Sequence, residues 1–143
     1  MPETAEAASA PVLEINGARA TIRLNRPKHL NRLQSEDLGH LVKLFDRIEA
    51  DPAIRVLVLT GTGRAFSAGY DLNSVADRAT SATAQPSAGS AFEAVVDRLE
   101  DLGVPTICRL NGGVYGGSTD LALACDFRIG VDTAEMFMPA ARL

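Results

Sequence analysis

The residues best suited to chemistry lie between Ile107 and Asp126. The strand expected at residues 106–110 leads into a glycine-rich segment, Asn111–Gly117, and a helix is expected directly after it. Such a turn directs backbone N–H groups outward at the positive end of the helix dipole. An anion, or an oxyanion that develops during a reaction, would be stabilised there. The sequence therefore predicts an anion-binding or oxyanion-binding turn at this junction.

Asp120 follows Gly117 by three residues and falls in the first turn of the expected helix. A carboxylate in this place can act as a general base beside an oxyanion site. It can also cap or flank the helix N-terminus, where acidic residues are common. The spacing alone favours this second interpretation and leaves the first open.

A second segment of small residues, Arg64–Leu72, follows the apolar run Val56–Leu59. Glycine and alanine permit close approach of backbone to a ligand, although the segment can also be only a tight turn. Gly61-x-Gly63 begins like a dinucleotide-binding fingerprint, but Phe66 stands where the third glycine is required. Ser118 lacks the glycine that completes a nucleophile elbow. A nucleotide-binding domain is thus a weaker alternative.

The composition excludes several classes of protein. The chain has 143 residues and a net charge of −4, which disfavours nucleic acid as the main partner. No apolar run reaches the length of a membrane span, and residues 1–10 resemble no targeting signal. Cys108 and Cys125 lie in apolar stretches and are expected to be buried free thiols, with no metal site. We expect a disordered tail at residues 1–10, one domain at residues 11–143, and a cytoplasmic location.

The periodicity of apolar residues predicts the elements that position these segments. Residues 12–15 and 20–24 alternate and flank Asn16-Gly17, which predicts a hairpin. Residues 56–59 form an apolar run typical of a strand buried on both faces in a parallel sheet. Further strands are expected at residues 106–110 and 127–131.

Helices are expected between the strands. Ser35 is the expected N-cap of the first helix, which ends before Asp51-Pro52 and has one apolar face. Residues 77–90 are expected to be a mobile loop, followed by a helix over residues 92–102. The third helix runs from residue 117 or 118 to 125. The order β-β-α-β-α-β-α-β predicts a layered α/β fold.

Three motifs occur in order along the chain: Asn25-Arg26-Pro27-x-x-x-Asn31, then Ala65–Leu72, then Asn111-Gly112 with Gly116-Gly117, Leu121-Ala122 and Cys125-Asp126. Together they resemble the enoyl-CoA hydratase/isomerase (crotonase) superfamily over residues 12–143. The resemblance implies a crotonase-like spiral of ββα units, acyl-CoA substrates, and a homo-oligomer that is a trimer or a hexamer. It implies no cofactor besides the coenzyme A thioester that serves as substrate.

The resemblance also assigns roles to individual residues. The backbone N–H groups of Tyr70 and Gly117 match the pair that holds the thioester oxygen, and Asp120 matches a catalytic glutamate, shortened by one methylene. The expected CoA-binding residues are Lys28, Ala65, Phe66, Ala68, Gly69 and Asp71. The ring of Tyr70 either narrows the acyl pocket or packs, and Phe92 and Phe137 are expected in the core.

Two departures from the family pattern affect which reaction we expect and whether the chain is catalytic. Ala140 falls where a second catalytic glutamate is expected, so isomerisation or thioester hydrolysis is favoured slightly over hydration. The alternative of another class is a non-catalytic acyl-CoA-binding or assembly module. The chain is also about half as long as members of the family, and we expect it to lack their C-terminal helical region. We therefore expect it to leave apolar surface uncovered.

Overall fold

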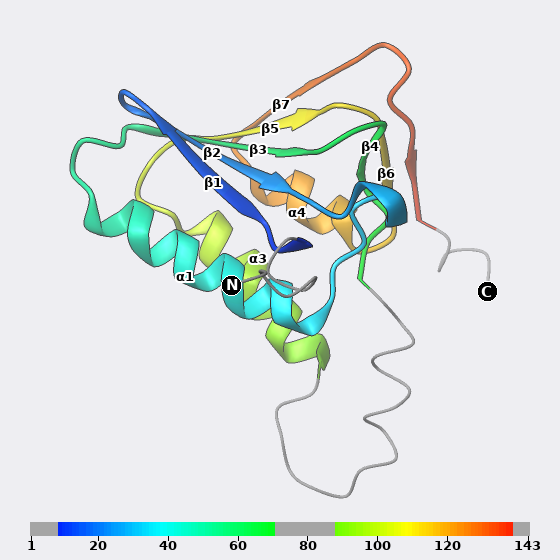
Figure 1. The fold of residues 1–143 in the computed structure, drawn as a ribbon, viewed down its shortest axis with the longest axis horizontal. Coiled ribbons are helices and arrows are strands. Elements are labelled where there is room, and N and C mark those ends of the chain that lie inside the picture. The colour runs from blue at the N-terminus through cyan, green and yellow to red at the C-terminus, as the bar shows by residue number, and fades with distance from the viewer. Residues whose placement is uncertain (1–8, 71–87, 139–143) are drawn as a thin grey trace, which may run out of the picture.

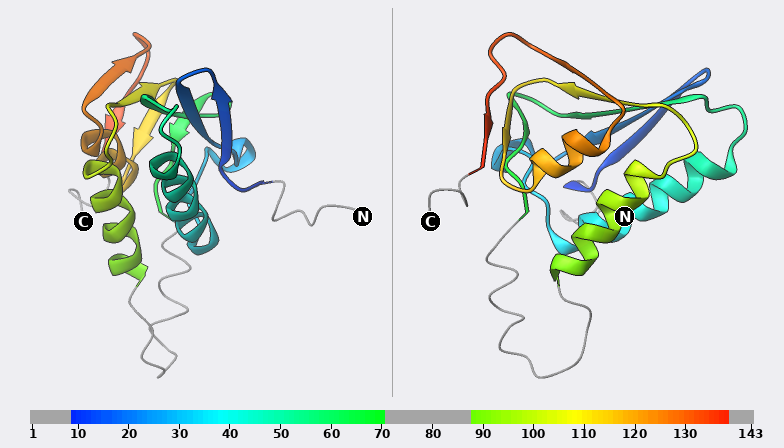
Figure 2. Two further views of the ribbon diagram at one scale, coloured as in Figure 1. Left: turned by 90° about the vertical axis from the view of Figure 1, so that its left-hand side faces the viewer. Right: turned by 180° about the vertical axis from the view of Figure 1, so that it is seen from behind.

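The computed structural model describes residues 9–70 and 88–138, which form two sheets and three α-helices. A five-stranded sheet has the order β1-β2-β3-β5-β7, and a three-stranded sheet has the order β4-β6-β8. The helices α1, α3 and α4 lie on the same face of the larger sheet (Figures 1 and 2). The smaller sheet stands at the end of the larger one where β3 and β5 finish (Figure 1).

The N-terminal hairpin confirms the prediction made for residues 12–24. β1 (Val12–Asn16) pairs antiparallel with β2 (Arg19–Leu24), with Asn16 opposite Arg19. The connecting residues are Gly17 and Ala18, and Gly17 has a φ of 61°. This left-handed conformation is one that glycine adopts at little cost.

Parallel pairing builds the rest of the larger sheet. β3 (Val56–Gly61) pairs with β2 and with β5 (Thr106–Leu110), and β5 pairs with β7 (Phe127–Gly130). Leu57 and Leu59 face the helices and are fully buried, whereas Val56 and Val58 are half-buried. The prediction that β3 is buried on both faces is therefore wrong for its first half, because the helices cover only one face of the sheet.

The helices were predicted well in position but less well at their first residues. α1 (Ser35–Ala50) buries the expected apolar face, but its N-cap is Gln34 and not Ser35. A reciprocal capping box between Gln34 and Asp37 satisfies the first turn. α3 (Ala88–Glu100) begins inside the stretch expected to be a mobile loop; the rest of that loop, up to residue 87, lies outside the described residues. α4 (Ser118–Ala124) matches its prediction closely.

The smaller sheet was missed by the sequence analysis. β4 (Ala65–Ser67), β6 (Gly113–Tyr115) and β8 (Met136–Phe137) are each two or three residues long and pair in parallel. Segments expected to be glycine-rich turns are therefore strands. Each lies a few residues after a strand of the larger sheet, so the chain repeats strand, strand and helix.

The core lies between the larger sheet and the helices. Its largest fully buried side chains include Phe45, Phe66, Leu41 and Leu121. Cys108 and Cys125 are both buried free thiols, as expected. A hydrogen bond that the Cys108 thiol donates to the neighbouring Cys125, together with burial, raises the pKa of Cys108, so this thiol stays protonated.

One side of the molecule is apolar and uncovered. Phe137 is 39% exposed, so its expected place in the core is wrong for this chain, since nothing among the described residues covers β8. It belongs to a group of exposed apolar side chains on α4, β7, β8 and their flanks: Leu123, Phe127, Ile129, Val131, Met136, Phe137 and Met138. Within the described ranges, no helix is long and apolar enough to cross a membrane, and no group of side chains has a composition suited to holding a metal ion.

Candidate functional site

The two glycine-containing segments singled out in the sequence lie against each other. Gly69 has a φ of 91°, and a Cβ built on it would lie 2.7 Å from the carbonyl oxygen of Tyr115 and 3.2 Å from the nitrogen of Gly117. Any side chain at residue 69 would push these segments apart. The structure therefore brings Gly69, the residue before Tyr70, next to the backbone nitrogen of Gly117, the N-cap residue of α4.

Ser118 fixes the start of α4 to the smaller sheet. Its fully buried hydroxyl accepts a hydrogen bond from the N–H of Tyr115 at 3.0 Å. The same oxygen lies 2.9 Å from the carbonyl of Ser67 in β4 and 2.7 Å from the carbonyl of Tyr115. Gly116, with a φ of 58°, allows the chain to turn from β6 into the helix. Ser118 is thus a structural residue whose hydroxyl is fully engaged.

The segment that ends at Tyr70 is held from its other side. Ser67 donates its hydroxyl to the carbonyl of Asn31 at 2.9 Å and accepts from the N–H of Gly69 at 3.1 Å. Leu33 donates its N–H to the carbonyl of Gly69 at 2.8 Å and forms an isolated parallel bridge with Tyr70. These bonds leave the backbone at residues 67–70 little freedom to move relative to α4.

Two motif asparagines hold the turn that precedes β4. The side-chain amide of Asn31 donates to the carbonyls of Thr62 and Ala65, each at 2.9 Å. The side-chain amide of Asn111 donates to the same Ala65 carbonyl at 2.9 Å and to that of Gly63. Asn31 is 1% exposed, and its side-chain Oδ1 accepts a hydrogen bond from the N–H of Arg26 at 2.9 Å. Both side-chain amides are therefore bonded to backbone groups of this turn.

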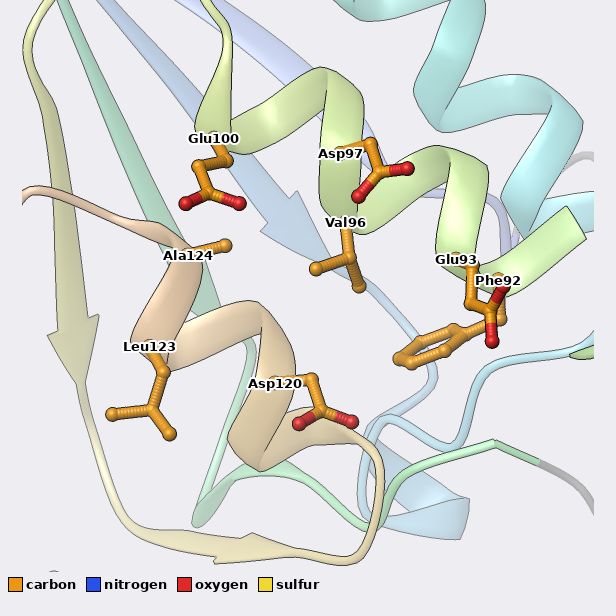
Figure 3. A pocket seen from close by; sticks show the side chains of 8 residues that line it. All are labelled: Phe92, Glu93, Val96, Asp97, Glu100, Asp120, Leu123 and Ala124. Carbon is orange, nitrogen blue, oxygen red and sulfur yellow. The ribbon is translucent and has the colours of Figure 1, made fainter. Parts of the chain in front are cut away.

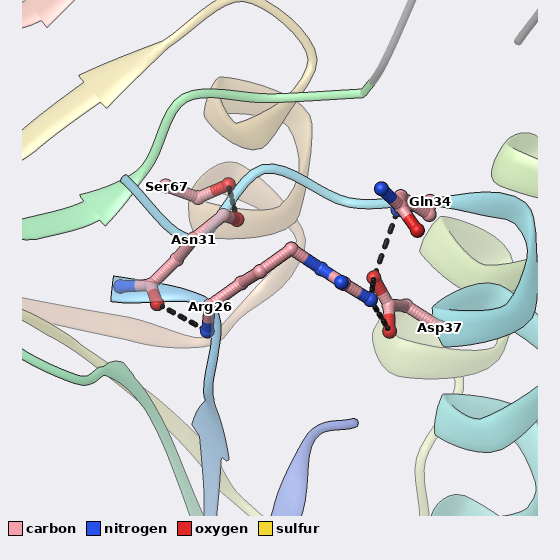
Figure 4. A network of polar contacts seen from close by, with 5 residues as sticks. All are labelled: Arg26, Asn31, Gln34, Asp37 and Ser67. Carbon is pink, nitrogen blue, oxygen red and sulfur yellow. Dashed lines mark hydrogen bonds and ion pairs between the residues drawn. The ribbon is translucent and has the colours of Figure 1, made fainter. Parts of the chain in front are cut away.

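An ion pair anchors the loop that carries Lys28. The guanidinium of Arg26 lies 3.2 and 3.3 Å from the two carboxylate oxygens of Asp37, which also accepts from the N–H of Gln34 at 2.8 Å (Figure 4). Both side chains are largely buried, so removal of either one would leave a charge uncompensated. The pair fixes the residues before the short 3₁₀-helix η2 (Pro27–His29) against the first turn of α1.

The structure places most of the expected CoA-binding residues on two adjacent segments, η2 and residues 65–69, which together form a strip. Lys28 is exposed on η2, whose Pro27 Cβ lies 3.4 Å from a Cβ built on Gly63. Ala65 and Phe66 are buried in β4, so only their backbone is available to a ligand. The N–H of Ala68 already donates to the carbonyl of Leu30 at 2.7 Å, and Gly69 is buried. Asp71 lies outside the described residues.

Asp120 borders a cavity between α3 and α4. The cavity has a volume of about 350 Å³ and is open to solvent, and Asp120 itself is exposed. The Asp120 carboxylate lies on the side of α4 that faces α3, across from the ring of Phe92 (Figure 3). The lining combines apolar and acidic side chains from the two helices: Phe92, Glu93, Val96, Asp97, Glu100, Asp120, Leu123 and Ala124. The expected acid/base residue is thus on the wall of a cavity next to Gly117.

Two aromatic rings border the same place and were not predicted to meet. The rings of Tyr70 and Phe92 have centroids 6.1 Å apart and are tilted by 55°. The Tyr70 hydroxyl lies 2.9 Å from the hydroxyl of Ser35. Phe92, expected in the core, packs against the core and also lines the cavity, while Tyr70 packs against Phe92. The only sequence feature that pointed to this role of Phe92 was its position at the N-terminal end of the apolar face of its helix.

Comparisons with known proteins identify relatives along nearly the whole chain. Residues 14–143 match the model of the enoyl-CoA hydratase/isomerase family. The chain is 38% identical over 128 residues to the 1,2-epoxyphenylacetyl-CoA isomerase of Escherichia coli, covering 86% of this chain and 48% of that protein. It is 34% identical over 133 residues to the short-chain-enoyl-CoA hydratase of Clostridium acetobutylicum, covering 92% of this chain and 50% of that protein.

A solved structure shares the fold. The enoyl-CoA hydratase of Bacillus anthracis is similar with a TM-score of 0.82 and 32% identity, over 92% of this chain and 51% of that chain. The chain thus spans about half the length of the relatives it matches. The order of the sequence motifs, the repeated strand, strand and helix, and the matching family model agree. The chain belongs to the enoyl-CoA hydratase/isomerase family.

Proposed function

We propose that the protein processes acyl-CoA thioesters by stabilising an enolate-like oxyanion on the backbone N–H groups of Tyr70 and Gly117. The observation that carries this proposal is the close packing of Gly69 against Gly117, where a Cβ on Gly69 would lie 3.2 Å from the Gly117 nitrogen. Only a segment without a side chain at residue 69 allows the two peptides to approach in this way. N–H dipoles fixed in advance favour the charged oxyanion over the neutral carbonyl, and so lower the reaction barrier.

The bonds around these two peptides support the same role. Ser67 and Leu33 hold the backbone before Tyr70, and Ser118 holds the turn at Gly117 to β4. Electrostatic stabilisation depends on donors that need no rearrangement when charge develops. A site that holds its donors with this many bonds suits that demand.

Asp120 is the proposed acid/base. It lies one turn into α4 from Gly117 and borders the cavity that an acyl group on the oxyanion site would enter. A single carboxylate can move a proton between two carbons of the acyl group, or activate water for attack on the thioester. Double-bond isomerisation and thioester hydrolysis are therefore proposed ahead of hydration. The position that matches the second glutamate, Ala140, lies outside the described residues.

The strip formed by η2 and residues 65–69 is the proposed contact for coenzyme A. Lys28 is exposed there and can meet a phosphate. Ala65, Phe66, Ala68, Gly69 and Asp71 are the other proposed contacts, through those backbone groups that the hydrogen bonds described above leave available. We further expect a homo-oligomer, a trimer or hexamer, as the resemblance implies, and a cytoplasmic location.

Substitution of Asp120 by Asn tests the assignment. We expect turnover to fall by about 10²- to 10⁴-fold, because the substitution removes proton transfer and keeps the shape. The measurement is the rate of crotonyl-CoA hydration, 3-hexenoyl-CoA isomerisation and acyl-CoA hydrolysis, together with the affinity for the thioester. Affinity should change little.

Asp97→Asn is the matched control, because Asp97 lines the same cavity from α3 and is also exposed. It should keep the rate of the unsubstituted protein. Equal losses in both variants would contradict a specific role for Asp120. Thioester binding without turnover in the unsubstituted protein would instead favour the non-catalytic acyl-CoA-binding module, which the exposure of Asp120 makes the second candidate.

A further inference from the structure

The ring of Phe92 meets the backbone at the start of α4 end on. The three nearest atoms to a Cβ built on Gly117 all belong to this ring: Cζ at 3.3 Å, Cε1 at 3.4 Å and Cε2 at 4.0 Å. The far edge of the ring therefore abuts the residue whose N–H is the proposed donor to the thioester oxygen. A side chain at residue 117 would displace the ring.

A second ring fixes the first. Tyr70, which carries the other proposed donor on its backbone, places its ring 6.1 Å from that of Phe92 at a tilt of 55°. This separation and tilt fall within the range in which aromatic pairs attract each other. The Tyr70 hydroxyl is held in turn by Ser35 at 2.9 Å. Both proposed donors are thus bordered by rings that are packed in defined positions.

The remaining surface next to Phe92 is open. Phe92 is half-buried and lines the cavity of about 350 Å³, in which Val96, Leu123 and Ala124 supply the other apolar surface (Figure 3). A thioester whose oxygen lies between the N–H groups of Tyr70 and Gly117 lies next to the Phe92 ring, and its acyl group can enter the cavity that this ring lines. Among the described residues, the Phe92 ring is therefore an apolar surface that such an acyl group can contact.

We propose that Phe92 determines acyl specificity, and that it selects acyl groups with an aromatic ring near the carbonyl over those with a saturated ring. A flat group can lie against the ring in an offset or edge-to-face arrangement, whereas a saturated ring is thicker and lacks the complementary charge distribution. This inference rests on the proposed function, since it uses the same two donors. It adds the class of acyl group that the site accepts.

The test compares two thioesters whose acyl groups share a six-membered carbon ring, which is aromatic in one and saturated in the other. Dissociation constants of benzoyl-CoA and cyclohexanecarbonyl-CoA are measured by calorimetry for the full chain and for Phe92→Leu. Leucine keeps an apolar side chain but removes the ring. We expect the unsubstituted protein to prefer benzoyl-CoA, and Phe92→Leu to reduce the ratio of the two constants by about three- to tenfold.

Two further variants separate this inference from other effects. Val96→Ala removes apolar surface from the same helix and cavity but no ring, so the ratio should stay as in the unsubstituted protein. Asp120→Asn should also keep the ratio while it loses turnover. Equal affinities for the two thioesters, or a ratio that Phe92→Leu leaves unchanged, would overturn the role of Phe92 and leave the proposed function standing. Failure of both thioesters to bind would overturn the role of Phe92 and the proposed function together.

Discussion

Asn31 shows how a single motif residue shapes the site without touching a ligand. It combines a positive φ of 55° with near-complete burial and joins Arg26, Thr62 and Ala65 through its side chain. Asparagine adopts the left-handed conformation more readily than most residues. Asparagine therefore both tolerates the left-handed backbone conformation and bonds the polar groups around it.

Substitution of Asn31 by Ala should lower the free energy of unfolding by about 2–4 kcal/mol. The variant removes the partner of the Thr62 carbonyl and of the Arg26 N–H, removes one of the two donors to the Ala65 carbonyl, and keeps the unfavourable backbone conformation. Urea denaturation measures the change. Asn16→Ala, at an exposed position on β1, is the control and should change stability by less than about 0.5 kcal/mol. Comparable losses in the two variants would show that the Asn31 bonds add little.

The sequence predicted these residues as a motif but not their bonds. Asn31 and Ala65 are 34 positions apart, and no local pattern links an amide to a carbonyl at that distance. Ser35 illustrates the opposite error. Its type predicted a helix cap, but Gln34 and Asp37 cap the helix, and the Ser35 hydroxyl lies against the hydroxyl of Tyr70. Local propensity identifies the candidates, and tertiary contacts decide among them.

At the scale of elements, the candidate site depends on how closely residues 68–70, which follow β4, approach the start of α4. It requires glycine at residue 69, where a Cβ would lie 2.7 Å from the carbonyl oxygen of Tyr115. Gly39 offers a contrast within the same chain, because it lies exposed inside α1 with nothing within 4 Å of a built Cβ. The two glycines have different reasons to be present.

Alanine at these two positions should change stability with opposite sign. Gly39→Ala should raise the free energy of unfolding by about 0.5–1 kcal/mol, because alanine favours the helix interior. Gly69→Ala should lower it and also reduce acyl-CoA turnover, because the strained residue forces the two donor peptides apart. Thermal unfolding and the rate assay measure both effects. A Gly69→Ala variant with unchanged stability and turnover would contradict the close packing.

Elements with a strong periodic pattern were predictable from sequence, and the short ones were not. The hairpin, α1 and α4 follow from alternation and helical spacing of apolar residues over five or more positions. β4, β6 and β8 span two or three residues, which is too short for a period to show. They are strands because of pairings such as Ala65 with Gly113, between distant parts of the chain.

For the whole molecule, the uneven cover of apolar surface is the main physical consequence of the fold. All four residues of β7 are exposed, and β7 is an edge strand of the larger sheet, as β8 is of the smaller one. Phe127 and Ile129 are 61% and 62% exposed. The sequence analysis expected such a surface from the length of the chain but could not place it, because its position depends on the strand order.

An exposed apolar edge strand is a template for association with other chains. The 143 residues expressed alone should therefore bind a hydrophobic dye such as ANS and associate as concentration rises. Ile129→Lys should reduce both effects while leaving the far-UV circular dichroism unchanged, because the side chain points to solvent and a charged edge opposes strand pairing. Leu59→Lys, in the buried part of β3, should instead unfold the chain. Sedimentation velocity at several concentrations measures association. If Ile129→Lys associates as readily as the unsubstituted chain, the contact forms elsewhere, and the exposed edge of β7 does not drive it.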